Sequence, residues 1–197
     1  MRILILCLAL SGAVFPALAA EMTSAYTDFR PASDCSTLDS STDEGGFSTM
    51  ICPGWRGYPV VLSSGDLRES VFYGFPPAGK PAWESFGPFN ATGDRIEWRI
   101  LTDTDKQVPV ATIHRWTVSD PEDETSKTEV LVVEKVGLPG VSEGCAVGLV
   151  VATGNEKANE TARRIADESV ADFACGADER VLVSGSVPLP SFDRQEN

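Results

Sequence analysis

The segment 52–61, CPGWRGYPVV, gathers three side-chain types that are common at binding surfaces. Trp55, Arg56 and Tyr58 lie in a stretch broken by glycines, so we expect them at an exposed turn just before a strand. Aromatic rings and a guanidinium group can stack on sugars, peptides or aromatic partners, and interface hot spots are enriched in them. The alternative is structural: Trp55 and Tyr58 would cover a disulfide at Cys52 and shield the edge of a sheet.

A second aromatic group follows in residues 74–93, which contain four prolines and four glycines. Neither a helix nor a central strand tolerates that density, so we expect a long loop fixed to the domain by its aromatic residues. Long ordered loops are often functional. The predicted recognition surface therefore consists of Trp55, Arg56, Tyr58, Trp83 and Phe86.

Signals for nucleophilic or acid–base hydrolysis are weak. The single histidine, His114, lies in the middle of the predicted strand ATIHRWTV, where a structural role is favoured over a Ser–His–Asp set. VSGSV at 183–187 lacks the G-x-S-x-G spacing, and no spacing among the 29 acidic residues singles out a glycosidase pair. We expect no catalytic residue and a non-enzymatic protein.

Nucleotide and metal sites are similarly unsupported. ATGNEK at 152–157 joins a strand to a helix without the glycine spacing of a phosphate-binding loop, so an ordinary turn is favoured. DPEDET at 120–125 offers hard oxygen donors for calcium, from Asp120, Glu122, Asp123 and Glu124, but lacks EF-hand spacing. We predict no metal and no cofactor.

Strands must position these residues. Alternating or apolar runs predict strands at 58–62, 67–73, 95–101, 108–118, 129–136 and 145–153. An apolar stripe at helical spacing predicts one helix over 155–175, with Asn155 as its cap. The predicted fold is α+β: a mostly antiparallel sheet of five to seven strands with one C-terminal helix packed on one face.

The first twenty residues resemble a secretory signal peptide, with Arg2, an apolar segment and ALAA at 17–20. A membrane anchor needs about 20 apolar residues, and Ser11, Gly12 and Pro16 interrupt this stretch. We expect cleavage after Ala20 and a periplasmic or secreted protein that does not insert into a membrane. The predicted organisation is a signal peptide (1–20), an irregular lead-in (21–46), one α+β domain (47–185) and a flexible tail (186–197).

Four cysteines remain after cleavage, an even number that predicts disulfides with three possible connectivities. The strand that begins at Cys145 and the returning helix each cover roughly 30 Å, which brings Cys175 back near Cys145. The other pair is then Cys35–Cys52. A zinc site is disfavoured, because no C-x-x-C spacing occurs and only one histidine is present.

The charge balance is strongly acidic. Without Arg2, 29 acidic residues face 15 basic ones, a net charge of −14 that repels nucleic acid and anionic lipid. Solubility is the simpler explanation of this charge. A net negative charge would also attract a cationic envelope protein. We expect a monomer that does not bind nucleic acid.

Four stretches together resemble a family of exported alphaproteobacterial proteins with no known activity: CPGWRGYPVV, PPAGKPAWESFGPFN with IEWRI, ATIHRW with VLVVEKVG, and ANETARRIADESVADFAC. The similarity spans most of 35–175. It implies one domain with two disulfides in the periplasm, where NAT (90–92) and NET (159–161) would not be glycosylated. It implies no activity and no catalytic residues.

Together these features favour a non-enzymatic binding or inhibitor-like module of the cell envelope. The alternatives are a structural accessory protein of the envelope and a hydrolase with a dispersed site where the Pro-rich loop meets the sheet. Salt-sensitive capture of a basic protein would favour the first.

Overall fold

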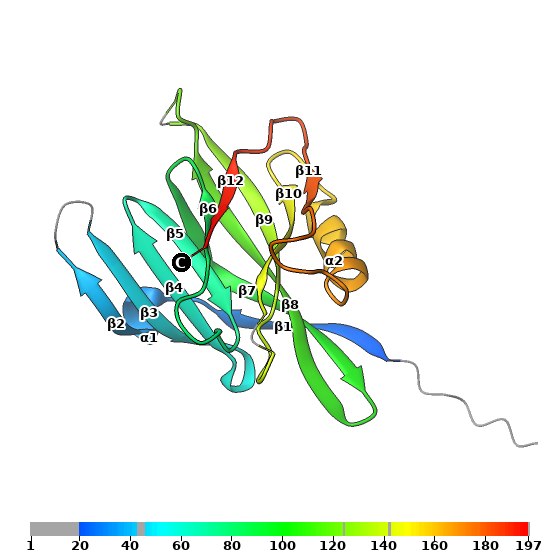
Figure 1. Ribbon diagram of the computed structural model, residues 1–197. Coiled ribbons are helices and arrows are strands. Elements are labelled where there is room, and N and C mark those ends of the chain that lie inside the picture. The colour runs from blue at the N-terminus through cyan, green and yellow to red at the C-terminus, as the bar shows by residue number, and fades with distance from the viewer. Residues whose placement is uncertain (1–19, 43–45, 124, 142, 197) are drawn as a thin grey trace, which may run out of the picture.

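Three layers make up the fold in the computed structural model, which describes residues 20–42, 46–123, 125–141 and 143–196. A four-stranded sheet, a six-stranded sheet and the helix α2 (Ala158–Ser169) follow one another across the molecule (Figure 1). The predicted signal peptide, except for Ala20, lies outside the described residues.

The six-stranded sheet has the order β1-β7-β8-β9-β10-β11. Its strands are β1 (Glu21–Asp28), β7 (Asn90–Asp103), β8 (Lys106–Ser119), β9 (Lys127–Lys135), β10 (Cys145–Val151) and β11 (Val181–Val183). Neighbouring strands are antiparallel except β10 and β11, which are parallel. The chain between these two contains α2, because parallel neighbours need a crossover connection.

The second sheet has the order β2-β3-β4-β5 and is antiparallel throughout. Its strands are β2 (Ser36–Ser41), β3 (Phe47–Pro53), β4 (Pro59–Gly65) and β5 (Arg68–Tyr73). A two-stranded sheet pairs β6 (Trp83–Phe86) with β12 (Phe192–Gln195). Two short helical turns are α1 (Pro31–Asp34) and η1 (Trp55–Gly57).

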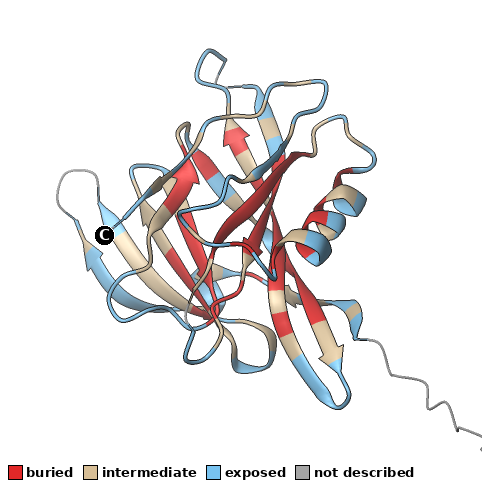
Figure 2. Ribbon diagram, turned by 45° about the vertical axis from the view of Figure 1, so that its right-hand side comes forward, coloured by how far each residue is buried: buried red, intermediate tan, exposed pale blue. Residues whose placement is uncertain are grey.

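The main core lies between the two larger sheets, where Figure 2 shows buried residues on the strands. Alternation along β7 turns Ile96, Trp98 and Ile100 toward the four-stranded sheet, and each is at most 2% exposed. A second cluster fills the space between the other face of the six-stranded sheet and α2, which contributes the small residues Ala162 and Ala166. Both faces of the central strands are therefore buried.

Charged side chains also fasten α2 to the sheet. Glu97 on β7 accepts hydrogen bonds from Arg163 of α2 (Nε–Oε1 2.6 Å) and from Ser24 (2.5 Å), while Arg99 donates to Asp167 of α2 (2.7 and 2.8 Å). Burial alone would raise the pKa of the Glu97 carboxyl. Hydrogen bonds from Arg163 and Ser24, with the charges of Arg163 and Arg99, instead lower that pKa below its usual value.

Both predicted disulfides are present, Cys35–Cys52 and Cys145–Cys175. The first joins the residue after α1 to β3, and the second joins the start of β10 to the segment that follows α2. Disulfides of this kind belong to an oxidising, extracytoplasmic compartment. Within the described residues, no helix is long and apolar enough to cross a membrane, and no group of side chains is arranged to hold a metal ion.

The predicted α+β class, with a mostly antiparallel sheet and one helix packed on it, is confirmed. Two segments outside the predicted 47–185 domain are more regular than expected. The segment 21–46, expected to be irregular, contains β1 and β2, and the tail 186–197 contains β12. These strands are rich in polar residues and gain their structure from pairing with β7, β3 and β6.

The predicted helix was too long. It covers Ala158–Ser169 and not 155–175, because the chain turns at both ends. Asn155 forms a local turn instead of a cap, accepting from the Lys157 amide (3.1 Å) and donating to the carbonyl of Val151 (3.0 Å). The long loop expected at 74–93 is likewise interrupted by β6.

Candidate functional site

Trp55, Arg56 and Tyr58 lie together at the turn between β3 and β4. The Arg56 guanidinium lies 4.8 Å from the centre of the Trp55 ring, and the Tyr58 ring lies 6.2 Å from that of Trp55 and 5.3 Å from that of Phe75. Arg56 is exposed and donates a hydrogen bond to Gln107 (2.6 Å). The structure thus brings these three predicted residues into one cluster with Phe75.

The backbone explains why this cluster forms a tight turn. A Cβ at Gly54 would lie 2.3 Å from the Tyr58 carbonyl oxygen and 2.8 Å from the Trp98 ring, so only glycine fits. Arg56 adopts left-handed backbone angles (φ 45°, ψ 43°), which are unfavourable for a residue with a side chain. Trp55 and Tyr58 are half-buried and pack against the main core, as does Cys35.

Trp83 and Phe86, both on β6, do not join this cluster in the way that the sequence suggested. Phe86 is 1% exposed and packs between Trp116 and Phe192, with ring centres 5.7 and 4.9 Å away. It is therefore a core residue and not part of a recognition surface. Trp83, the first residue of β6, is half-buried and lines a hollow on a different face.

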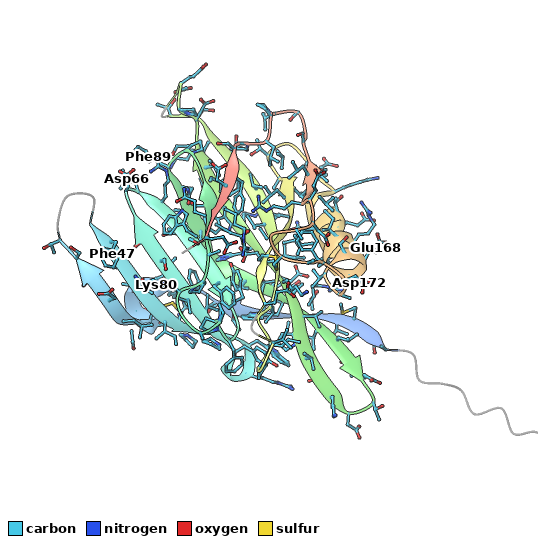
Figure 3. All side chains as sticks on the ribbon, viewed as in Figure 1. Phe47, Asp66, Lys80, Phe89, Glu168 and Asp172 are labelled. Carbon is cyan, nitrogen blue, oxygen red and sulfur yellow. A yellow bond between two sulfur atoms is a disulfide. The ribbon has the colours of Figure 1, made fainter. Side chains whose placement is uncertain are left out.

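This hollow lies on the face of the four-stranded sheet that points away from the main core, and we call it the outer hollow. It encloses about 430 Å³ between the sheet and residues 76–83, a size suited to a small ligand. Aromatic walls come from Phe47, Phe72 and Trp83. Figure 3 labels Phe47 and Lys80, two of its lining residues, over this sheet.

The sheet register sets the floor of the outer hollow. Asp39 pairs with Thr49, Thr49 with Ser63, and Ser63 with Ser70, so one polar row crosses all four strands. Directly paired residues point to the same face of a sheet and repeat at about 4.8 Å across the strands. The row is therefore a ladder of three hydroxyl groups and one carboxylate.

The overhanging segment is held at both ends. Gly74, with φ +94°, approaches Gly137 so closely that a Cβ would lie 2.2 Å from its carbonyl oxygen. At the other end, the Glu84 amide donates to Ser70 Oγ (3.0 Å) and Ser85 Oγ donates to the Glu69 carbonyl (2.7 Å). The outer hollow is therefore framed by fixed backbone on both sides.

Several polar groups of the outer hollow have no partner within the described part of the chain. Asp39, Thr49 and Ser63 make no side-chain hydrogen bond or ion pair there, whereas Ser70 is engaged with Glu84. Lys80 Nζ lies 5.9 Å from the Phe47 ring centre, a loose cation–π contact. The floor and rim can therefore still donate and accept hydrogen bonds.

The groups with strongly perturbed acidity lie elsewhere. His114 is fully buried in the main core, where its Nδ1 lies 2.6 Å from the Tyr73 hydroxyl and its Nε2 lies 2.8 Å from the Gly93 carbonyl oxygen. Burial lowers the pKa of His114 to about 4 and raises that of Tyr73 well above its usual value. This histidine cannot meet a substrate, so the Ser–His–Asp alternative has no base.

A larger groove of about 960 Å³ lies beside the C-terminal segment, with Glu84 in its lining. Glu84 accepts from the Ala146 amide (2.8 Å) and from Arg180 (2.9 Å), and pairs with Arg194 (3.4 Å). Burial and then the charge of Glu84 raise the pKa of the neighbouring Glu134 well above its usual value. The charged groups around Glu84 therefore bind one another and fasten the C-terminal segment.

A third hollow, of about 840 Å³, surrounds the β4–β5 turn. Leu67 is 72% exposed and Phe89 is 46% exposed there, and Figure 3 labels Phe89 beside Asp66. Arg68 lies 5.4 Å from the Phe89 ring centre and donates to the Gly87 carbonyl (2.6 Å). The Arg68 guanidinium is thus already bound to groups of this region.

The chain matches no protein-family model, and comparisons with curated proteins and with solved structures also found no match. The resemblance to exported alphaproteobacterial proteins therefore remains a prediction, of which the two disulfides are present.

Sequence reasoning missed most of the outer hollow. Asp39, Thr49 and Ser63 come from three different strands, and only their register makes them neighbours. The one usable signal is that β3, β4 and β5 each carry serine or threonine next to an apolar run. Phe47 and Lys80 carried no distinguishing pattern.

Proposed function

We propose that this protein is a non-enzymatic binding module of an extracytoplasmic compartment, with the outer hollow as its ligand site. One observation carries the proposal: unpartnered polar groups face a hollow with aromatic walls on a rigid sheet. Binding sites are typically apolar concavities with a few converging polar groups.

Binding is favoured over catalysis because of where the titratable groups lie. The described groups with a shifted pKa do not line the outer hollow, and active sites are where such shifts usually gather. The hollow contains a carboxylate and hydroxyls but lacks a histidine to activate them, since His114 lies in the core. A hydrolase with a dispersed site at this loop is the alternative that the test must separate.

Thermal unfolding in the presence of a library of small soluble compounds tests the proposal, because a ligand that binds only the folded state stabilises it. Ser63→Phe should fill the outer hollow while keeping a residue that strands accept. Ser36→Phe is the matched control, because Ser36 is exposed on the same sheet outside the hollow. Stabilising compounds should act on the wild type and on Ser36→Phe but not on Ser63→Phe.

Two results would contradict the proposal. Compounds that stabilise Ser63→Phe as much as the wild type would place the site elsewhere, and an absence of stabilising compounds would leave the outer hollow without a ligand role. Mass spectrometry of the recovered compounds completes the test, because turnover would favour the hydrolase.

The expected partner, a cationic envelope protein, is a separate prediction that depends on the net charge of −13. Capture of a basic protein from envelope extract should then be lost at high salt, since screening weakens contacts between exposed charges. Retention of that capture by Ser63→Phe would show that such a protein binds outside the outer hollow.

A further inference from the structure

We propose that the ligand of the outer hollow is a neutral saccharide of two or three rings, an inference that depends on the proposed binding function. The argument uses the hydrogen-bonding capacity of the floor, its spacing, the aromatic walls and the charge balance of the lining.

The floor requires a ligand that both donates and accepts hydrogen bonds at several points. The hydroxyls of Thr49 and Ser63 can each do both, the Asp39 carboxylate only accepts, and the Lys80 ammonium only donates. Asp39, Thr49 and Ser63 make no side-chain hydrogen bond or ion pair within the described residues, and Lys80 has the loose contact with the Phe47 ring. Sugar hydroxyls, which donate and accept at neighbouring positions, match such a mixed set.

The spacing of the polar row suits an extended ligand. From Asp39 to Ser70 the row crosses three intervals between strands, which is roughly 14 Å at about 4.8 Å each. Each interval is comparable to the width of one sugar ring. A short oligosaccharide lying across the strands can therefore reach successive members of the row.

Aromatic walls supply the second element of sugar recognition. Phe47 is 42% exposed at one side of the outer hollow, and Trp83 is half-buried on the overhanging segment. One face of a sugar ring carries mainly C–H groups and packs against an aromatic ring with release of water. Such a ligand satisfies the polar floor and the apolar walls together.

The charges favour a neutral ligand over a cationic peptide. Among the described residues, the lining contains one anion, Asp39, and one cation, Lys80. A peptide rich in lysine would find one attractive group and one repulsive group there, with no net electrostatic gain. The described lining of this hollow therefore does not share the acidic balance of the whole protein.

Calorimetric titration with maltotriose, cellotriose, triacetylchitotriose and trilysine tests the inference. At least one trisaccharide should bind the wild type more tightly than trilysine does. Ser63→Ala and Thr49→Val should each weaken that binding by about 3- to 10-fold, the effect of one lost hydrogen bond. Ser63→Ala removes a hydroxyl and Thr49→Val replaces one with a methyl group, both at partly exposed sites, so unfolding temperatures should stay close to that of the wild type. Ser36→Ala should bind normally.

The outcomes separate this inference from the proposed function. If library compounds stabilise the wild type but not Ser63→Phe, and no trisaccharide binds, the saccharide assignment is wrong and the binding site stands. If neither binds, both fail. Trilysine binding that exceeds trisaccharide binding, or trisaccharide binding that Ser63→Ala and Thr49→Val leave unchanged, would also overturn the assignment.

Discussion

The buried histidine makes the stability of this protein sensitive to mild acid. The His114 ring nitrogens lie beside the Tyr73 hydroxyl and the Gly93 carbonyl, and burial lowers the His114 pKa from 6.5 to about 4. In the unfolded chain the imidazole takes up a proton below pH 6.5, whereas in the folded protein it stays neutral until about pH 4. The free energy of unfolding should therefore decrease as the pH is lowered from 6.5 to 4, by about 3 kcal/mol in total.

Urea unfolding at several pH values, for the wild type and for His114→Phe, checks this expectation. The variant lacks the titrating group, so the difference in unfolding free energy between the two proteins should shrink or reverse as the pH falls from 6.5 to 4. Effects of Glu97 and Glu134 are present in both proteins and cancel in the difference. Parallel curves for the two proteins would show that His114 does not carry this pH dependence.

At the turn before β4, the two possible roles of Trp55 give opposite results. Trp55 is half-buried against the main core, so Trp55→Ala should lower the free energy of unfolding by about 2 kcal/mol, less than for a fully buried aromatic residue. Arg56→Ala removes an exposed side chain and should cost about 0.5 kcal/mol or less. Denaturant unfolding measures both, and an unchanged stability for Trp55→Ala would favour the recognition role instead.

At the scale of elements, α2 is held on the sheet by its apolar stripe and by an ion pair between the buried Glu97 and the partly exposed Arg163. Glu97 is 7% exposed and accepts from Arg163, so Glu97→Ala leaves Arg163 and Arg99 without this partner. We expect a loss of about 3 kcal/mol in unfolding free energy. Arg164→Ala is the control, because its pair with Glu168 is exposed on both sides and should contribute under about 0.5 kcal/mol.

The pH dependence of this pair has a defined sign. The Glu97 pKa is lowered in the folded protein, so its contribution is complete above the usual pKa of 4.5 and is lost as the pH falls through the lowered value. Thermal unfolding of Glu97→Ala and Arg164→Ala at neutral and acidic pH measures this contribution. The stability loss caused by Glu97→Ala should be smaller at acidic pH. Equal stability losses for the two variants at neutral pH would contradict a special role of the Glu97–Arg163 pair.

For the whole molecule, the periodicity of apolar residues predicted the strands and the helix that build the core. The alternation of Ile96, Trp98 and Ile100 and the apolar run of β10 correctly predicted strands, and the helical stripe correctly predicted α2. The pairing of Cys145 with Cys175 was also correct, although the strand and the helix are shorter than the lengths from which it was predicted. These features follow from local spacing, which a sequence displays directly.

Elements that depend on distant partners could not be predicted in the same way. The polar strand STLDSS forms β2 because β3 lies beside it, and β12 forms because β6 does. Phe86, predicted as part of the recognition surface, belongs instead to the core, where it packs against Trp116 and Phe192. The outer hollow depends on the same long-range information, because it exists only once four strands are in register.

The central claim is that the outer hollow is where this protein binds its ligand. Amide NMR spectra of the labelled wild-type protein, recorded while the best-stabilising compound or trisaccharide is added, locate the bound ligand directly. The account predicts that shifts concentrate on the amides of Thr49, Ser63, Ser70, Lys80, Ala82 and Trp83. Shifts concentrated on Trp55, Arg56 and Tyr58, or on the turn at Leu67 and Phe89, would contradict it.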